Sequence, residues 1–514
     1  MSDSVVETTA GPVRGRSSAR SGHSVTSWKG IRFAAAPVGE LRFRVPQPVE
    51  PHSEVFDASS FGPACPQPKL PNMPLDLGSA QGDDCLRLNI WAPSDTSTPK
   101  PVLVWLHGGA YVLGSASQPL YNGSRLASGG DVVVVTVNYR LGALGFLDLS
   151  SFSSSRCRFE SNLGLHDVLA ALRWVRDNIA GFGGDPERVT VFGESAGAGL
   201  VTTLLAVPSA AGLFARAIAQ SSPATSVYDK DRGAQLAGFM LDRMGVDPSD
   251  AHRLLELPTE AIIAASKKAF TEVPVRNPGT LAFVPIVDGD LLPDYPVKIA
   301  QQGHTLPIPL IIGTNRNEAA LFRLMRSPLM PITPHAITSM FTQIAAEQPD
   351  LQLPTREQLQ TAYSGLRSAG QALGIATDVG FRMPSVWLAE GHSSVAPVYL
   401  YRFDYSTPLL KLLLVRAAHA TELPYVWGTL GAPGDPTLKL GGAKTAKEVS
   451  ARMRARWVNF AAHGRPDGPE GAPEWPSYGE ADRACLFIGA SDSVVHDSDA
   501  PIRAAWGNRV VGFR

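Results

Sequence analysis

Residues 189–200 read VTVFGESAGAGL and combine the three parts of a strand–turn–helix unit. The β-branched and aromatic run before Gly193 favours a strand, the glycines at 193 and 197 permit a sharp turn, and the apolar residues beyond them continue as a helix until Pro208. Ser195 stands at the tip of the turn, where a nucleophile elbow carries its hydroxyl. The stretch predicts an α/β fold with Ser195 as candidate nucleophile. A purely structural βα turn is the alternative.

The rest of the chain alternates short apolar runs with helical patterns. Residues 164–182 repeat apolar side chains at the three- and four-residue spacing of an amphipathic crossover helix, which stops at Gly181. The apolar runs indicate buried strands at 86–93, 101–109, 131–139, 188–193, 215–221, 308–314, 397–405 and 484–489. This order predicts a central, mostly parallel β-sheet flanked by helices. We expect one domain over residues 1–514, with helix-rich insertions at about 223–305 and 320–395 roofing the strand ends.

Composition excludes several classes of function. Lys plus Arg number 46 against 47 Asp plus Glu, so the net charge of −1 supplies no basic field for nucleic acid. No apolar run is long enough for a membrane span. The first residues lack the basic and apolar pattern of a secretory signal, so we expect a cytoplasmic protein.

Cysteine usage indicates neither a metal site nor a disulfide scaffold. The chain has 4 cysteines and no C-x-x-C pair, so we expect no metal. The hydrolysis expected below needs no cofactor. Cys65 and Cys85 flank a polar, proline-broken segment that an oxidising compartment would allow to close, whereas cytosolic glutathione argues against a bond. The sequence leaves this pairing open.

A second glycine-rich turn follows the strand of residues 101–109. PVLVWLHGGAYVLGS, residues 101–115, leads from a strand into His107, Gly108, Gly109 and Ala110. Amide groups of such a loop can point into a cavity and stabilise an oxyanion, as H-G-G loops do in esterases. The alternative is a glycine turn anchored by His107.

Both motifs belong to a longer set that resembles the type B carboxylesterase/lipase family of the α/β-hydrolase superfamily, in the style of bacterial para-nitrobenzyl esterases. The matching stretches run in order from about residue 28 to residue 476: GIRFAAAPVGELRFRVPQP, GDDCLRLNIWAP, VWLHGGAY, GDVVVVTVNYRLGALGFL, FGGDPERVTVFGESAG, PIVDGD, GTNRNEAALF, HATELPYVWG and WVNFAAHGRPDG. The resemblance implies an α/β-hydrolase fold and hydrolysis of carboxylic esters.

A serine nucleophile needs a base, and the base needs an acid partner. In this fold the nucleophile, the acid and the base follow one another along the chain, so the acid is expected between Ser195 and the expected base His419. Glu318 lies in this range and follows the strand IPLIIGT closely enough to project from its end. Glu318 also matches the family's glutamate, while Asp288 in PIVDGD is the rival. The resemblance places the base at His419, whereas His392 and His463 read as structural.

The remaining site residues are predicted from chemistry and resemblance together. Oxyanion donors are expected at the amides of Gly109, Ala110 and Ala196. The resemblance adds supporting roles for Gly108, and for an inner polar network of the three residues Glu194, Ser221 and Glu422.

The expected partner is a small-molecule ester with a hydrophobic acyl or aryl group, bound by a monomer or small homo-oligomer. No aromatic residue lies between Cys65 and Cys85, so the cation–π site of cholinesterases is missing and choline esters are disfavoured. Candidate pocket walls are Tyr111, Phe322, Leu324 and Met325, with packing in the core as the alternative. Two alternatives stay open: a catalytically silent binding protein on the same fold, and an amidase, carbamate or lactone hydrolase with the same triad.

Overall fold

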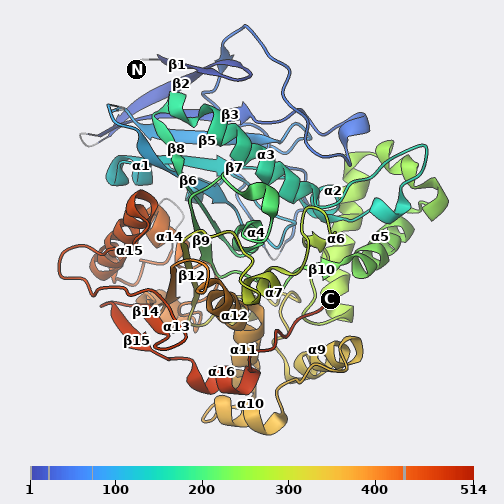
Figure 1. Ribbon diagram of the computed structural model, residues 1–514, viewed down its shortest axis with the longest axis vertical. Coiled ribbons are helices and arrows are strands. Elements are labelled where there is room, and N and C mark those ends of the chain that lie inside the picture. Colours follow the sequence, from blue (N-terminus) through green and yellow to red (C-terminus); the bar gives the residue numbers. More distant parts are fainter. Residues whose placement is uncertain (1–2, 21–22, 72, 96, 432–435) are drawn as a thin grey trace.

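One β-sheet organises the computed structural model, which describes residues 3–514 except 21–22, 72, 96 and 432–435 (Figure 1). Its strands are β1 (Asp3–Thr8), β2 (Gly11–Arg20), β3 (His23–Arg32), β4 (Phe56–Asp57), β5 (Arg87–Pro93), β6 (Lys100–Leu106), β7 (Val133–Val137), β8 (Gly184–Glu194), β9 (Arg216–Gln220), β12 (Leu310–Asn315), β13 (Val398–Phe403), β14 (Ala484–Ile488) and β15 (Ser493–His496). Their spatial order is β1-β2-β3-β5-β7-β6-β8-β9-β12-β13-β14-β15, with β4 beside β2.

The middle of the sheet is parallel and its edges are antiparallel. All neighbouring pairs from β7 through β6, β8, β9, β12 and β13 to β14 are parallel. The β1-β2, β2-β3, β3-β5, β5-β7 and β14-β15 pairs are antiparallel. Because parallel strands end at one common edge, loops from distant parts of the sequence meet there.

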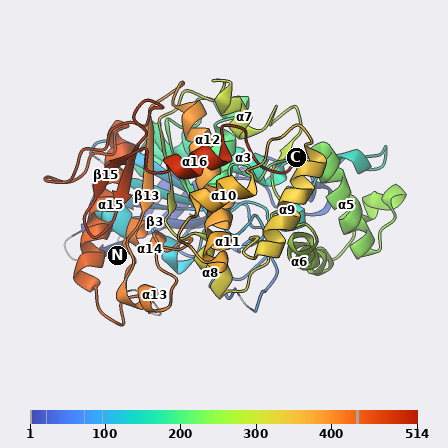
Figure 2. The same cartoon turned by 90° about the horizontal axis from the view of Figure 1, so that it is seen from below.

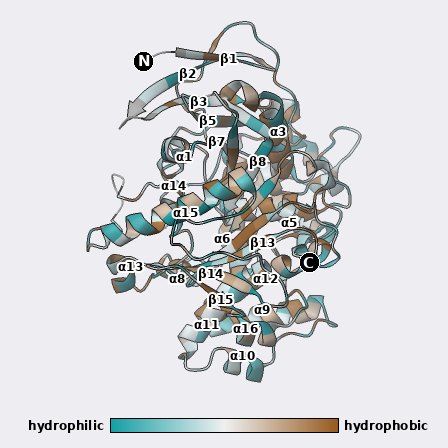
Figure 3. Cartoon of the chain, turned by 60° about the vertical axis from the view of Figure 1, so that its left-hand side comes forward, coloured by the Kyte–Doolittle hydropathy of each residue, from teal (hydrophilic) through white to brown (hydrophobic). Residues whose placement is uncertain are grey.

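Helices cover both faces of the sheet. Side chains alternate along each strand, so Val102 and Val104 of β6 enter one apolar core while Leu103 and Trp105 enter the other. The first core includes residues of α3 (Leu163–Asn178), α4 (Ala196–Leu204) and α12 (Met383–His392). The second includes residues of α1 (Ser124–Gly130), α14 (Leu423–Trp427) and α15 (Ala443–His463). Figure 3 shows α15 as a banded helix, apolar residues alternating with polar ones, as expected for a helix with one buried side.

The two ranges expected to be insertions contain helices. The first holds α5 (Lys230–Met244), α6 (Thr259–Arg276) and α7 (Pro296–Gln301), with a small parallel pair of β10 (Tyr228–Asp229) and β11 (Ile286–Val287). The second holds α8 (Ala319–Leu324), α9 (Pro334–Glu347), α10 (Arg356–Ala362), α11 (Ser368–Thr377) and α12. Seen from below, α8 to α11 lie together in front of the strands (Figure 2). The remaining helices are α2 (Gly142–Phe146), α13 (Pro408–Leu412) and α16 (Ala500–Trp506).

The predicted fold class is confirmed, and each of the eight predicted strands overlaps a strand of the sheet. The crossover helix is α3, which ends at Asn178. The strands β1, β2 and β3 were not predicted, because they lack the continuous apolar run of the central strands. Within the described residues, no helix combines the length and apolar composition needed to cross a membrane.

Candidate active site

Ser195 occupies a strained turn between β8 and α4. Its backbone angles are φ 57° and ψ −124°, a region that non-glycine residues rarely adopt, at a cost on the order of 1–3 kcal/mol. The turn is held by the N–H of Ser195, which donates to the carbonyl oxygen of Gln220 over 2.9 Å. A Cβ at Gly197 would lie 2.0 Å from the carbonyl oxygen of Leu106, and one at Gly193 would lie 2.6 Å from the backbone of Gly197. Only glycines therefore fit on either side of the serine.

The loop after β6 approaches this serine turn with its backbone. Gly109 has φ +122°, and a Cβ there would lie 2.2 Å from the carbonyl oxygen of Leu113. A Cβ at Gly108 would lie 2.8 Å from the carbonyl oxygen of Glu194, so both glycines permit close approach. In the described part of the chain, the N–H groups of Gly109 and Ala110 donate to no protein atom, and both residues line the same cavity as Ser195.

The amide of Ala196 completes this set of donors. Ala196 is the first residue of α4, where an α-helix leaves its N–H groups without intrahelical acceptors. It also lines the cavity of Ser195. Gly109, Ala110 and Ala196, from two sequence-distant turns, thus line one cavity together with Ser195.

His419 and Glu318 form a buried hydrogen-bonded pair. Nδ1 of His419 lies 2.7 Å from Oε2 of Glu318, and the side chains are 8% and 0% exposed. The second carboxylate oxygen of Glu318 accepts bonds of 2.6 Å from the Ser221 hydroxyl and 2.6 Å from the backbone N–H of Asn315. The carboxylate is therefore fixed on both oxygens, and it orients the imidazole ring.

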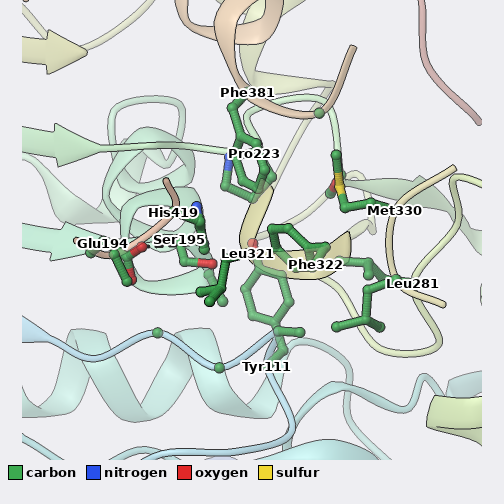
Figure 4. Close-up of a pocket in the computed structure, with 18 of the residues that line it drawn as sticks. Tyr111, Glu194, Ser195, Pro223, Leu281, Leu321, Phe322, Met330, Phe381 and His419 are labelled. Carbon is green, nitrogen blue, oxygen red and sulfur yellow. Dashed lines mark ion pairs between the residues drawn. The ribbon is translucent and has the colours of Figure 1, made fainter. Parts of the chain in front are cut away.

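Glu194 faces the other nitrogen of the same imidazole. Nε2 of His419 lies 3.2 Å from Oε1 of Glu194, and Figure 4 shows this pair beside Ser195. Burial raises the pKa of Glu194 above its ordinary value. Burial alone lowers the pKa of His419, but the carboxylates of Glu194 and Glu318 outweigh it and raise that pKa to about 9. Among the described residues there is no hydrogen bond between Ser195 Oγ and His419, a contact that often tightens only when substrate binds.

A further buried carboxylate, Glu422, lies behind this pair. It accepts from Nε2 of Gln220 over 3.0 Å and from Nδ2 of Asn315, which also donates to the carbonyl oxygen of Ala418 over 2.7 Å. Burial raises the pKa of Glu422. Asn315 thus joins the loop of Glu318 to the loop of His419. Glu422 was predicted, whereas Asn315 and Gln220 were not, although both stand at the ends of strands that lead into the site.

A cavity of about 380 Å³ opens in front of Ser195 and His419. Its walls are mostly apolar. They come from the segment between Cys65 and Cys85, from both insertions and from the end of the described chain, and they include Met73, Leu281, Phe322, Met330, Met340 and Phe513. Figure 4 shows Leu281 and Met330 at the side of the cavity away from Ser195, with Leu321 and Phe322 between. A hydrophobic chain can therefore extend from the serine into the cavity.

Of the candidate walls, Tyr111, Phe322 and Met325 line the cavity, and Leu324 was wrong. Leu324 is 57% exposed. Phe322 and Met325 are three positions apart and share one side of the segment, whereas Leu324 lies between them and points elsewhere. Asp288, the rival acid, bonds instead to the side chain of Asn162 at 2.7 Å.

The other two histidines have structural surroundings. His392 is fully buried, 2.7 Å from the Thr305 hydroxyl and 2.8 Å from the carbonyl oxygen of Ile308. His463 ends α15 directly before Gly464, as predicted. Among the described residues, no group of three or more His, Cys, Asp or Glu side chains is arranged to bind a metal ion.

The open question of Cys65 and Cys85 is answered by a disulfide between them, with the Cα atoms 5.0 Å apart. The argument from cytosolic glutathione against this bond was therefore wrong for the structure. Both cysteines are nearly inaccessible to solvent, at 2% and 1% exposure, which protects the bond from exchange with external thiols. The loop it closes carries Met73 and Leu75 to the cavity wall.

Parallel strands that end in a serine turn, a turn of free amides and a histidine loop define the α/β-hydrolase fold, and this is the class of the protein. The chain belongs to the carboxylesterase family, whose sequence profile matches residues 2–502. It is a serine carboxylesterase that hydrolyses carboxylic esters.

Individual relatives agree along almost the whole chain. Para-nitrobenzyl esterase of Bacillus subtilis (strain 168) is 38% identical over 506 residues, which cover 98% of each chain. Acylcarnitine hydrolase of Mus musculus is 35% identical, covering 88% of this chain and 81% of its own. Among solved structures, the carboxylesterase EST55 of Geobacillus stearothermophilus superposes with a TM-score of 0.84 at 36% identity, covering 98% of this chain and 100% of its own.

Proposed function

We propose that Ser195, Glu318 and His419 are the catalytic triad and that the substrates are esters with hydrophobic acyl or aryl groups. The observation that carries the proposal is the convergence of the Glu318–His419 pair, the Ser195 turn and three amides on one apolar cavity. A polar or charged acyl group would lose its hydration there without gaining partners, whereas an alkyl or aryl group gains from burial.

In the proposed reaction, His419 accepts the proton of the Ser195 hydroxyl while the oxygen attacks the ester carbonyl. Amides of Gly109, Ala110 and Ala196 stabilise the resulting oxyanion, and His419 gives the proton to the leaving alcohol. Water then attacks the acyl-enzyme with the same groups in the reverse roles. Glu318, held by Ser221 and Asn315, keeps the imidazole in the tautomer that can accept at Nε2.

Supporting roles follow from the contacts. Gly108 leaves room for Glu194, which adds negative charge beside the imidazolium, and Ser221 and Glu422 hold the loops of the acid and the base. We also propose that the chain forms one domain and acts as a monomer or small homo-oligomer, which light scattering after gel filtration measures.

The cytoplasm stays the proposed compartment, and it requires that the buried Cys65–Cys85 bond persist in a reducing environment. Thiol labelling of denatured protein, taken directly from the source cells, tests this requirement. If Cys65 and Cys85 are labelled in protein from the cytoplasm, their thiols are free there and the disulfide of the structure does not form in that compartment.

The direct test of the site combines labelling with turnover. A fluorophosphonate probe should label Ser195 of the folded protein, and Ser195→Ala should lose both labelling and hydrolysis of para-nitrophenyl esters while keeping its thermal unfolding midpoint. Wild-type turnover by the purified variant would refute the nucleophile. Absence of labelling and turnover in the wild type would favour a silent binding protein, and greater kcat/KM on lactones or aryl amides would favour the other hydrolases.

A further inference from the structure

One irregular helical turn touches the site without a part in the reaction described above. The helices α11 and α12 form one continuous run, interrupted at Asp378–Arg382 by a π-helical turn, called here the π turn. A π turn widens the helix and weakens its hydrogen bonding, and such turns recur at functional sites. Asp378 and Phe381 of this turn are buried.

Phe381 of the π turn packs on the imidazole of His419. The two ring centroids are 4.5 Å apart with an angle of 31° between the ring planes, and Phe381 is 4% exposed. Phe322 contacts the same imidazole at 5.2 Å. Two aromatic rings thus restrict the orientation of the ring that Glu318 holds by one hydrogen bond, and Figure 4 shows all three around the cavity.

The same segment is bonded to the loop that carries Glu318. Nη2 of Arg382 donates to the carbonyl oxygen of Arg316 over 3.3 Å. The N–H of Ala319 donates to the hydroxyl of Thr377 over 3.2 Å. These bonds lie on either side of Glu318 in sequence, so the helix at 377–382 contacts both the acid's loop and the base's ring.

A buried ion pair fixes Arg382 in this position. Nη1 of Arg382 lies 2.8 Å from Oδ1 of Asp378, which is fully buried. Oδ2 of Asp378 accepts 2.5 Å from the Tyr363 hydroxyl, and Nε1 of Trp506 donates to that hydroxyl over 3.0 Å. Asp499 lies 4.0 Å from Arg382 on the outer side. Because burying an ion pair costs several kcal/mol of desolvation, a role in specifying geometry accounts for it better than a role in stability.

We propose that Asp378 and Arg382 are positioning residues for the reaction: their ion pair sets the π turn, and the π turn holds Phe381 against His419 and Arg382 against the Glu318 loop. The proposal rests on the proposed triad. Neither side chain touches the substrate cavity. Both act through the relative placement of Glu318 and His419.

The test compares this ion pair with a second buried pair of the same chemistry. Asp378→Asn and Arg382→Met break the first pair. Asp167→Asn breaks the Arg140–Asp167 pair, which is also buried, has a distance of 2.7 Å and does not line the cavity. Rates with para-nitrophenyl acetate are expressed per serine labelled by a fluorophosphonate, so misfolded molecules are not counted. Phe381→Leu keeps an apolar side chain and provides a variant that folds if the charge variants do not.

The groups that face His419 and shape its titration are Glu194, Glu318 and Glu422. If the π turn positions the Glu318–His419 pair, three variants should lower kcat between about 10- and 100-fold while KM changes little: Asp378→Asn, Arg382→Met and Phe381→Leu. The acid limb of their kcat/KM profile then moves to lower pH, because a looser Glu318 stabilises the imidazolium less. Asp167→Asn lowers the unfolding midpoint and leaves both quantities unchanged.

Two results would overturn the proposal: wild-type kcat and pH profile in the three variants, or an equal loss of kcat in Asp167→Asn. The downfield proton resonance of the Glu318–His419 hydrogen bond gives a readout independent of turnover. It should shift or broaden in Asp378→Asn and not in Asp167→Asn. An unchanged resonance in Asp378→Asn contradicts the positioning role, whereas failure of the proposed triad would appear in the wild type, as a Ser195 that a fluorophosphonate does not label.

Discussion

The imidazole of His419 lies between two carboxylates, with Glu318 2.7 Å from Nδ1 and Glu194 3.2 Å from Nε2. Glu318 lies in the turn that follows β12, directly before α8, and Glu194 is the last residue of β8, so two parallel strands bring both side chains to one ring. The Glu318 carboxylate favours the imidazolium, the form that the ring takes after it accepts a proton from the serine, and Glu194 adds to this effect when it is ionised.

The acid partner is tested by Glu318→Gln. The amide still fits, but it cannot hold the imidazole in the required tautomer as a carboxylate does, so kcat should fall by about 10⁴-fold, as in other triads. Steady-state kinetics with para-nitrophenyl butyrate measure the loss. Asp288→Asn removes the rival carboxylate, which contacts Asn162, and should leave kcat near the wild-type value. A large loss of kcat in Asp288→Asn with little loss in Glu318→Gln would identify Asp288, and not Glu318, as the acid.

The pH dependence follows from the raised pKa of His419. The base must be neutral to act, and its pKa is raised to about 9, so kcat/KM should increase with pH through the neutral range and level off in the alkaline range. Glu194→Gln removes one of the charges that raise this pKa, so the acid limb should move to lower pH. Glu160→Gln, whose carboxylate pairs with Arg44 instead, is the control. A limb that does not move in Glu194→Gln would show that Glu194 does not influence the base.

Acyl-chain preference is tested at Leu281, which lines the end of the cavity away from Ser195. Leu281→Trp shortens the cavity. Since each buried methylene contributes about 0.8 kcal/mol, the hexanoate-to-acetate ratio of kcat/KM should fall at least about tenfold. Leu324→Trp introduces the same side chain at an exposed position and should not change the ratio. If both substitutions change the hexanoate-to-acetate ratio equally, the acyl chain does not bind beside Leu281.

The disulfide should contribute both stability and cavity shape. Replacing Cys65 and Cys85 by serine releases a loop of 20 residues, and loop-closure entropy predicts a loss of about 3 kcal/mol of unfolding free energy. Because Met73 and Leu75 belong to that loop, KM should rise as well. Urea titration and kinetics check the two effects. Cys157→Ser, which removes a free thiol, is the control and should change neither.

The strands and the serine turn were predictable because their physical causes are local. Continuous apolar runs such as β6 are buried on both sides of the sheet, and a run of that kind can be recognised without knowing its neighbours. The turn at Ser195 is likewise determined by the glycines on either side of it. Glu318 was predicted because a residue just after a parallel strand must lie near the functional edge.

Residues whose role depends on contacts between distant loops could not be predicted in this way. Asn315 gains its role only because the loops of residues 316–318 and 417–422 meet in space. Gly380 and Pro384 in TDVGFRMPS mark a disturbance of the helical pattern, but they do not indicate a π turn or the contact of Phe381 with His419, which depends on the fold. The bond between Cys65 and Cys85 depends on the compartment as well as the fold, and spacing alone indicates neither.

The cavity has a consequence for how the protein is made. Its wall takes Met73 from the first part of the chain and Phe513 from the last residues of the sequence. On the ribosome, the sheet can start to assemble early, but the wall contributed by Phe513 is missing until that residue has been synthesised and has left the exit tunnel. A nascent chain stalled before that point would carry a reactive serine without its finished chamber, so partly synthesised molecules should be less selective among esters than released ones.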